Sequence, residues 1–494
     1  MRILYLDLDT LRPDHLGCYG YQRNTSPNID KICNEGKRFD NYFCSDAPCL
    51  PSRAALMTGL IGYHSGIVGH GGTAADLRLE GASRNFRSSL SRSSLPAILK
   101  SHGLHTTFIG GFGERHSAWW FYAGFREIHD TGMGGLESAE DVTPTVMKWM
   151  EQNASEDNWY LHVNYWDPHT PYRSPIEFGN PFRDNPIPNW LTQEIIDQHR
   201  LKPGPHSAQD INMYDNHTDE RFPRQPGEVD DLLSFRKLID GYDTGIRYMD
   251  SHIGAIIDLL KEKGIYEDTA IIISSDHGEN LGELGIYSEH GTADAVTCRI
   301  PLIIKWPGVR SSGPDKGFHY NLDFSSTIDE LLGGDGGTNP LSHSFASSVL
   351  TNTDSSRPYL VISQCAHVCQ RSIRWGQWLY IKTWHDGYHL FPDSMLFDIE
   401  NDPHEIHDLA QNLPMICQQA EIYLEEWQAH MQSTMPDKQE IDPMITVLKE
   451  GGPFHARGKL KTYIERLEKT NRGWAVPELI SKHPEEFKYE EPKP

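Results

Sequence analysis

Short apolar segments alternate with helical ones over the first 306 residues, and this order constrains the fold more than any other feature. Helical patterns lie at about 143–152 and 235–263. The strand-like apolar runs around them cover residues 2–9, 106–109, 159–165, 270–274 and 300–306. Such runs joined through helices are typical of a large, mostly parallel sheet with helices on both faces. We therefore expect an α/β domain over residues 1–355.

The remaining segments predict an insertion, a second unit and a tail. Residues 173–231 are polar and too long for an ordinary connection, which predicts an insertion at the rim of a site. Residues 333–356 have the Gly, Ser, Thr and Asn content of a linker. Short strand patterns and a helical one over residues 356–432 predict a smaller α+β subdomain containing a short antiparallel sheet. Residues 433–494 form a charged tail whose role the pattern does not indicate.

Charge and cysteine usage exclude several classes of protein. Lys and Arg number 45 against 69 Asp and Glu, a net charge of −24, which disfavours nucleic acid or an anionic membrane as partner. The eight cysteines are scattered, unlike a disulfide framework. The pattern C-x-H-x-C at residues 365–369 could ligate a metal, but no second ligand cluster is visible, so buried free thiols are the expectation there.

The N-terminal segment indicates where in the cell the protein is expected. Its apolar run is short and interrupted by Asp7 and Asp9, so no signal peptide is visible, and no apolar run reaches the length of a membrane span. We expect a cytoplasmic protein, or a periplasmic or secreted one if a signal was removed. The oligomeric state is left open.

The first candidate site is the pattern C-x-P-S-R at residues 49–53, which runs into a helix. Pro51 sets the first turn of this helix and Gly59 ends it. Cys49 would then lie beside a helix N-terminus, where free N–H groups and the helix dipole favour an anion. Arg53 lies one turn further on and faces the same end.

This segment resembles the sulfatase signature, in which the cysteine is oxidised to formylglycine. Leu50 is bulkier than the small residue usual at that place, whereas the cysteine, proline and arginine are present. Three further motifs resemble the same family, at residues 6–30, 275–279 and 396–405. On these motifs the chain is identified as a member of the sulfatase branch of the alkaline phosphatase superfamily, most like the carbohydrate sulfatases. The resemblance implies the fold of that superfamily and a sulfuric ester hydrolase.

A metal site is expected from the residues and from the resemblance together. Asp7 and Asp9 are two apart on a strand and point to one side, while Asp276 and His277 follow another strand. Acids at the carboxyl ends of parallel strands meet in the crevice where α/β enzymes bind ligands, and carboxylates suit a hard divalent cation. The resemblance implies Asp9, Asp276, His277 and the modified Cys49 as ligands, with Asp7 as a further candidate. Ca²⁺ is the first choice, and Mn²⁺ or Zn²⁺ stay open because of the histidine.

Three histidines and two arginines receive catalytic or binding roles from the resemblance. His116 follows Arg115 where the family carries K-x-H, and Arg115 would supply the missing cation to the substrate. His169 lies in a P-H-x-P segment, and His290 stands where a lysine often contacts the sulfate. In the implied mechanism hydrated formylglycine attacks sulfur, Arg53 stabilises the developing charge, and His169 or His290 protonates the leaving oxygen. His116 then takes the proton of the second hydroxyl, which expels sulfate and restores the aldehyde.

Basic and aromatic residues after the signature helix suggest a subsite for a sulfated carbohydrate. Arg78, Arg84, Arg87 and Arg92 lie close together in sequence, and arginine pairs well with sulfate and carboxylate groups. The aromatic run 119–122 could stack on sugar rings, although a solvated basic loop and a half-buried helix face are equally good interpretations.

We expect a carbohydrate sulfatase acting on a glycosaminoglycan-like oligosaccharide, matured by a formylglycine-generating or sulfatase-maturing enzyme. One alternative is a phosphonate monoester or phosphodiester hydrolase of the same superfamily. A second is a non-catalytic protein that binds sulfated glycans.

Overall fold

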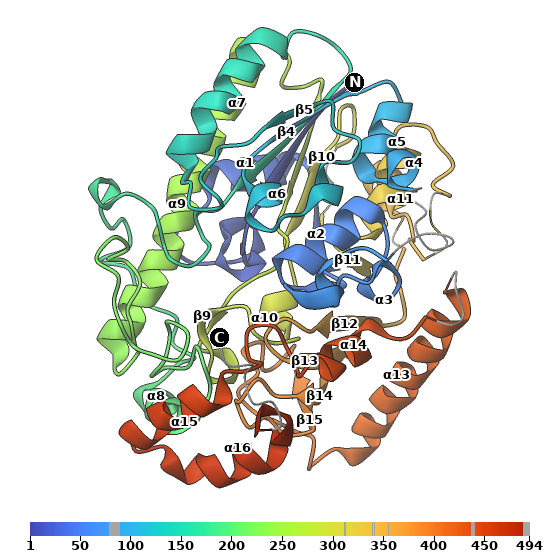
Figure 1. The fold of residues 1–494 in the computed structure, drawn as a ribbon. Helices are drawn as coiled ribbons and strands as arrows, with labels where there is room; N and C mark the ends of the chain where they lie inside the picture. Colours follow the sequence, from blue (N-terminus) through green and yellow to red (C-terminus); the bar gives the residue numbers. More distant parts are fainter. Residues whose placement is uncertain are drawn as a thin grey trace, which may run out of the picture.

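In the part of the chain that it describes, the computed structural model contains a large sheet, a smaller sheet and a two-stranded hairpin (Figure 1). It describes residues 1–78, 89–310, 313–337, 339, 341–353, 355–435 and 440–487. Within these residues the large sheet has eight strands. In spatial order they are β11 (Asp315–Tyr320), β2 (Lys37–Phe43), β10 (Leu302–Lys305), β7 (Thr269–Ser274), β1 (Arg2–Leu8), β6 (Trp159–Tyr165), β4 (His105–Ile109) and β5 (Glu127–His129).

Strand β1 lies at the centre of the large sheet and sets the position of the site. It pairs in parallel with β6 and with β7, so that Asp7 lies opposite Asn164 on one side and Ser274 on the other. β10 runs antiparallel to β7 and β2, which makes the sheet mixed although mostly parallel. The predicted fold class is confirmed. Strands β2 and β11 were not predicted, because charged and polar residues interrupt their apolar pattern.

Helices cover both faces of this sheet, as the alternation of apolar side chains along β1 requires. Ile3 and Tyr5 belong to the core on one face, and Leu4 and Leu6 to the core on the other. One face packs against α2 (Cys49–Thr58), α5 (Leu95–Ser101) and α11 (Asp323–Leu331). The other packs against α1 (Pro27–Glu35), α7 (Ala139–Asn153) and α9 (Leu232–Glu262) (Figure 1).

The small sheet confirms the predicted short antiparallel sheet, and one of its strands comes from the N-terminal part of the chain. Its order is β15 (Ser394–Asp398), β14 (Trp378–His385), β13 (Cys369–Trp375), β12 (Leu360–Gln364) and β3 (Asp46–Ala47). The helix α13 (Pro414–Thr434) packs against it. β3 pairs in parallel with β12 two residues before the signature helix begins. The small sheet therefore touches the site directly, and the boundary predicted at residue 355 remains a prediction.

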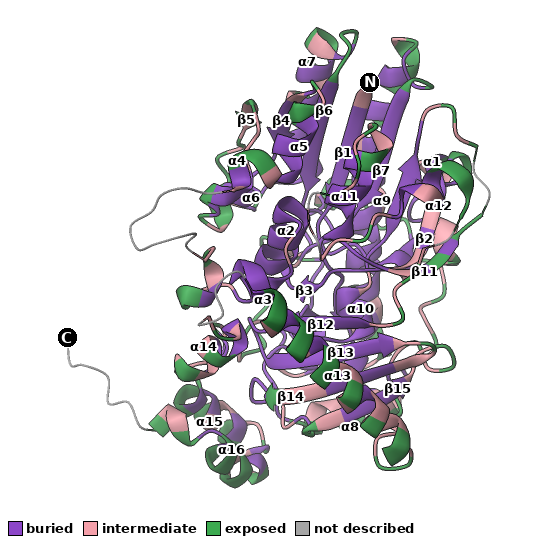
Figure 2. Ribbon diagram, turned by 90° about the vertical axis from the view of Figure 1, so that its right-hand side faces the viewer, coloured by how far each residue is buried: buried purple, intermediate pink, exposed green. Residues whose placement is uncertain are grey.

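The tail and the insertion are structured where they are described. The tail contains α14 (Pro443–Lys449), α15 (Leu460–Lys469) and α16 (Val476–Lys482), and Figure 2 shows the last two beside the small sheet with much exposed surface. The insertion contains α8 (Gln193–Leu201), and the predicted linker contains α12 (Ala346–Thr351). The remaining short elements are α3 (Gly62–Ser65), α4 (Leu90–Ser93), α6 (Phe112–Arg115), α10 (Ala295–Cys298), β8 (Asn280–Leu281) and β9 (Tyr287–Glu289).

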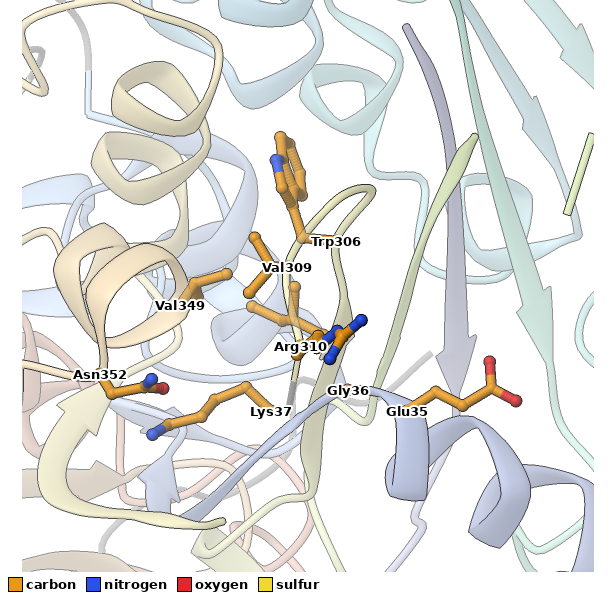
Figure 3. A pocket seen from close by; sticks show the side chains of 9 residues that line it. Glu35, Gly36, Lys37, Trp306, Val309, Arg310, Val349 and Asn352 are labelled. Carbon is orange, nitrogen blue, oxygen red and sulfur yellow. The ribbon is translucent and has the colours of Figure 1, made fainter. Parts of the chain in front are cut away.

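A small pocket opens at the end of the sheet opposite the site (Figure 3). Lys37, Trp306 and Asn352 line it. It lies at the end of β10, where Lys305 pairs with Ile271, whereas the first residue of β10, Leu302, pairs with Ser274 at the carboxyl end of β7. Its volume is about 10 Å³, room for one water molecule. Among the described helices, none combines the length and the apolar content that crossing a bilayer requires.

Candidate active site

Four of the predicted ligands meet at the carboxyl ends of β1 and β7. Asp9 follows β1, Asp276 and His277 follow β7, and Cys49 is the first residue of α2. One ligand atom from each of these four buried residues lies within 4.8 Å of the other three. The Sγ of Cys49 is 3.0 Å from Nε2 of His277. Residues far apart in the sequence thus form one compact donor set.

Arg53 joins this set to Asp7. Its Nε and one terminal nitrogen contact the two oxygens of Asp7 at 2.9 and 3.1 Å, and its other terminal nitrogen contacts Asp9 at 2.9 Å and Asp276. All four side chains are almost completely buried. Three carboxylates face one guanidinium, which leaves two negative charges uncompensated if all are ionised. Asp7 lies outside the four-residue donor set, and His162 Nε2 also approaches it at 3.2 Å.

The donor set fits a divalent cation. Asp9 Oδ1 is buried and has no hydrogen-bond partner among the described residues. Burial and the charge of Asp276 raise the pKa of Asp9 to about 7, and burial raises the pKa of Asp276 to about 6. Both pKa values are raised because the carboxylates are buried close together and the charge of Arg53 does not balance them. Oxygen donors with one imidazole suit Ca²⁺ or Mn²⁺, and the imidazole keeps Zn²⁺ possible.

The beginning of α2 is tied to the loop that carries Asp276. The hydroxyl of Ser52 donates to the backbone carbonyl of Asp276 at 2.6 Å, and the side chain of Asn321 donates to the Ser52 carbonyl at 2.9 Å. These bonds fix the helix start, and with it Cys49, against the end of β7. Burial, followed by Asp9 and Asp276, raises the pKa of the Cys49 thiol. The unmodified residue is therefore a thiol rather than a thiolate in these surroundings.

Two of the three predicted histidines lie next to the donor set. Nε2 of His169 is 4.0 Å from Oδ1 of Asp9, while its Nδ1 donates to the carbonyl of Thr170. The ring of His290 lies 4.3 Å from the ring of His277 and 5.3 Å from the ring of His169, centroid to centroid. Nε2 of His290 is 3.1 Å from the Glu289 carboxylate. Burial lowers the pKa of both His169 and His290, so both are neutral at neutral pH unless a partner charges them.

Arg115 is the last residue of α6, and His116 follows it directly. The ring of His116 lies 4.9 Å from Phe112, and its Nε2 is buried without a hydrogen-bond partner in the part of the chain described. Burial, and then the charges of Arg115 and Arg53, lower the pKa of His116. A neutral imidazole with an unpaired nitrogen can accept a proton. The guanidinium of Arg115 is exposed and lies 5.3 Å from the Trp166 ring centroid.

The predicted carbohydrate subsite receives little support from the contacts. Arg78 pairs with Glu440 and donates to the carbonyls of Tyr63 and Ile441, so both of its terminal nitrogens already have partners. Arg84 lies outside the described residues. In the aromatic run Trp119 is 57% exposed whereas Trp120 is buried. The substrate roles of Arg78 and Arg84 stay predictions.

Several residues at the site were missed by sequence reasoning. Arg173, the first cationic residue of the insertion, is buried; burial lowers its pKa to about 10 despite the nearby Asp167. It donates to the carbonyls of Thr170 and Gly135, and its Nε has no partner among described residues. His70, His367 and His455 also gather nearby. His367 is the central residue of the C-x-H-x-C pattern at 365–369, whereas His70 and His455 are lone residues in distant segments, and no spacing in the sequence links the three.

The sequence is similar to one protein family over more than half of its length. The family model described as Sulfatase matches residues 2–334. Iduronate 2-sulfatase from Homo sapiens is 26% identical over 368 residues, which are 67% of this chain and 64% of that protein. The chain therefore spans just under two thirds of the length of this relative.

Two solved structures share the fold. A structure in complex with its substrate D-glucosamine-2-N,6-O-disulfate has a TM-score of 0.68 at 18% identity, covering 89% of this chain and 99% of the other. The phosphonate monoester hydrolase of Agrobacterium radiobacter has a TM-score of 0.67 at 16% identity, covering 88% and 97%. At these identities the likeness shows the fold alone.

Proposed function

The chain belongs to the sulfatase family, and on that premise we propose that it hydrolyses sulfate esters with a formylglycine made from Cys49. The observation that carries the proposal is the convergence of Cys49 with Asp9, Asp276 and His277 around the Arg53 guanidinium. That arrangement joins a modifiable cysteine, a cation site and a fixed positive charge in one buried space.

One divalent cation, with Ca²⁺ as first choice, would be held by Asp9, Asp276, His277 and the modified residue 49. When bound, it would lower the pKa of a hydroxyl on that residue and balance the carboxylate charge. Arg53 keeps its guanidinium against Asp9 and Asp276 and would stabilise negative charge on the sulfate oxygens.

Three histidines would then move protons. His169 or His290 would donate a proton to the leaving alcohol oxygen as the S–O bond breaks, which requires the charged form of a group whose pKa burial lowers. His116 would accept the proton of the second hydroxyl of the hydrated aldehyde. The electrons of that O–H bond would re-form C=O as the bond between carbon and the sulfate oxygen breaks, so that sulfate leaves and the aldehyde returns. One water molecule then hydrates the aldehyde again, and this is the water that the hydrolysis consumes.

The substrate class that we propose is a sulfated carbohydrate of the glycosaminoglycan type. In support, a relative is named iduronate 2-sulfatase, and a fold neighbour is in complex with a sulfated glucosamine. Arg115 and Arg173 supply positive charge beside the site, which suits an anionic group. A formylglycine-generating or sulfatase-maturing enzyme is the partner that the chemistry at Cys49 requires.

The phosphonate monoester or phosphodiester hydrolase activity remains the second candidate. It is favoured by His277 in the donor set and by the fold shared with a phosphonate monoester hydrolase. A non-catalytic glycan-binding role is disfavoured, because Cys49, Arg53 and both carboxylates of the donor set are all in place.

The test combines a mass measurement with matched substrates. In active protein the peptide that holds Cys49 should be about 18 Da lighter than its thiol form, because SH and one H give way to an aldehyde oxygen. Nitrophenyl sulfate should then be turned over faster than nitrophenyl phenylphosphonate, and Cys49→Ala should lower either rate by at least about 10⁴-fold. A faster phosphonate ester would support the second candidate. An unmodified thiol in protein that still hydrolyses sulfate esters would refute the mechanism.

A further inference from the structure

We propose that His70, His367 and His455 form a second metal site, which takes a transition-metal ion of the Zn²⁺ class. One nitrogen from each of the three imidazoles lies within 4.8 Å of the other two. The set contains no residue of the Asp9, Cys49, Asp276 and His277 donor set, and it does not depend on the proposed sulfatase activity.

Three separate segments bring these histidines together. His70 lies between α3 and the short helix at Gly72–Ala75, His367 in the turn between β12 and β13, and His455 between α14 and α15 of the tail. The backbone N–H of His455 donates to the Ala366 carbonyl at 3.1 Å, and the Tyr214 hydroxyl donates to the His455 carbonyl at 2.8 Å. These bonds hold the backbone of His455 beside His367 independently of its side chain.

The separations of the nitrogens suit a tetrahedral ion. Nδ1 of His70 is 3.0 Å from Nε2 of His455. The His455 ring stacks on His367 at a centroid distance of 4.3 Å and an angle of 16°, so one of these two rings turns about its side-chain torsions when both nitrogens point at one ion. Ligands at the usual Zn–N length of 2.0–2.1 Å lie about 3.3 Å apart in a tetrahedron. The donors of the cluster are therefore within about 1.5 Å of the required separations.

The imidazoles are in the state that metal binding needs. Burial lowers the pKa of His70, His367 and His455, to about 4 for His455, and the neighbouring histidines lower the first two further. All three are thus neutral at neutral pH and offer lone pairs. Imidazole donors favour Zn²⁺, Cu²⁺ and Ni²⁺ over Ca²⁺.

Glu289 places a carboxylate beside the cluster. Its Oε1 lies 3.7 Å from Nε2 of His367, which is longer than a hydrogen bond, and 3.1 Å from Nε2 of His290, and its Oε2 lies 3.2 Å from Nδ1 of His206. It therefore adds negative charge near a bound cation. The ring of His70 is also 5.3 Å from that of His116. A bound ion would thus lie beside the histidines that flank the candidate active site.

Metal analysis of the whole chain tests the proposal. The protein is stripped with EDTA, dialysed against equimolar Zn²⁺ and Ca²⁺, and analysed by mass spectrometry of the elements. We expect His367→Ala and His455→Ala to lose about one equivalent of Zn²⁺ relative to the wild type, with an affinity at least about 100-fold lower. The matched control His407→Ala changes an exposed histidine outside the cluster and should keep the full content.

Two further variants separate the two metal sites. Asp276→Asn should lose metal from the donor set at Cys49 and retain the Zn²⁺ of the histidine cluster. Replacing that ion by Co²⁺ should give the intense visible absorption of a tetrahedral complex, and His70→Gln should abolish it. Equal Zn²⁺ content in wild type, His367→Ala and His455→Ala would overturn the proposal, as would a Zn²⁺-free Asp276→Asn protein. In either case the three histidines would be a hydrogen-bonded cluster only.

Discussion

The hydroxyl of Ser52 donates a 2.6 Å hydrogen bond to the backbone carbonyl of Asp276, and so couples the start of α2 to the carboxyl end of β7. Both residues are buried, and the bond adds to the Arg53–Asp276 ion pair and to the 3.0 Å contact of Cys49 with His277 between the same two segments. It thus contributes to the position of residue 49 relative to two of the proposed metal ligands, Asp276 and His277.

We expect Ser52→Ala to lower stability by about 1–3 kcal/mol, because the Asp276 carbonyl loses its partner in a buried place. The measurement is the thermal midpoint of protein in which Cys49 is an unmodified thiol, so that maturation plays no part. Ser251→Ala is the control, since Ser251 bonds only within α9 and is exposed. Equal midpoints for both variants would contradict the coupling.

A second prediction separates the two candidate proton donors. If His290 protonates the leaving oxygen, His290→Ala should lower kcat/KM by about 10²–10⁴-fold for an alkyl or sugar sulfate and much less for nitrophenyl sulfate, whose leaving group needs no proton. His169→Ala should then show a similar loss for both substrates, because His169 lies beside Asp9. The opposite pattern assigns the proton to His169, and no difference between substrates in either variant would exclude both.

The third prediction concerns pH and the anchoring of the tail. His483 Nε2 lies 2.8 Å from Asp386. Burial by itself lowers the pKa of His483, but the hydrogen bond and charge of Asp386 outweigh it, so the pKa is raised above 6.5. The pair therefore stabilises the fold fully below pH 6.5, and this contribution is lost as the pH rises through the folded-state pKa.

Thermal midpoints from pH 5.5 to 8.5 check this sign. The wild type should exceed His483→Asn in stability most at the acidic end, because buried histidines of lowered pKa give both proteins the same opposing pH dependence. This difference should shrink as the pH rises, by about 1.4 kcal/mol for each unit by which the pKa of His483 is raised. The exposed His430→Asn serves as control and should follow the wild type. A wild-type midpoint that rises with pH while His483→Asn stays parallel to it would contradict the prediction.

The main sheet and the core of the site could be predicted because their signals are local. Apolar runs that end in acids gave β1 and β7 with Asp9 and Asp276 at their carboxyl ends, and the C-x-P-S-R pattern gave the helix start at Cys49. The histidine cluster could not be predicted, because His70 and His455 lie 385 residues apart and neither stands in a motif. Their meeting depends on how the tail packs, which no periodicity encodes.

Arg78 shows the same limit of sequence reasoning for a residue that was expected to bind substrate. Its basic neighbours in the sequence suggested a sulfate subsite, whereas its guanidinium pairs with Glu440 at the beginning of the tail. A run of like charges in the sequence does not show which oppositely charged residues of distant segments pair with it.

The fourth prediction concerns one of the ion pairs that attach the tail. Both terminal nitrogens of Arg371 contact Asp442 at 2.7 Å, and the Arg371 side chain is only 1% exposed. Asp442→Ala leaves this guanidinium without its carboxylate, which costs about 3–5 kcal/mol for a buried charge. We expect a lower thermal midpoint, faster proteolytic release of residues beyond 442, and weaker Zn²⁺ binding, because His455 lies on the released segment.

The exposed pair Arg221 and Asp219 provides the matched control, since such pairs contribute about 0–1 kcal/mol. Asp219→Ala removes the same kind of carboxylate and should leave the midpoint, the proteolysis rate and the Zn²⁺ affinity close to those of the wild type. If Asp442→Ala behaves in the same way, the tail is held by its other contacts, among them those of Tyr214, Tyr388 and Glu450 and the ion pairs of Asp210 and Asp386. If its proteolysis accelerates while Zn²⁺ affinity is unchanged, His455 is not a ligand, and the second metal site fails although the anchoring role of Asp442 stands.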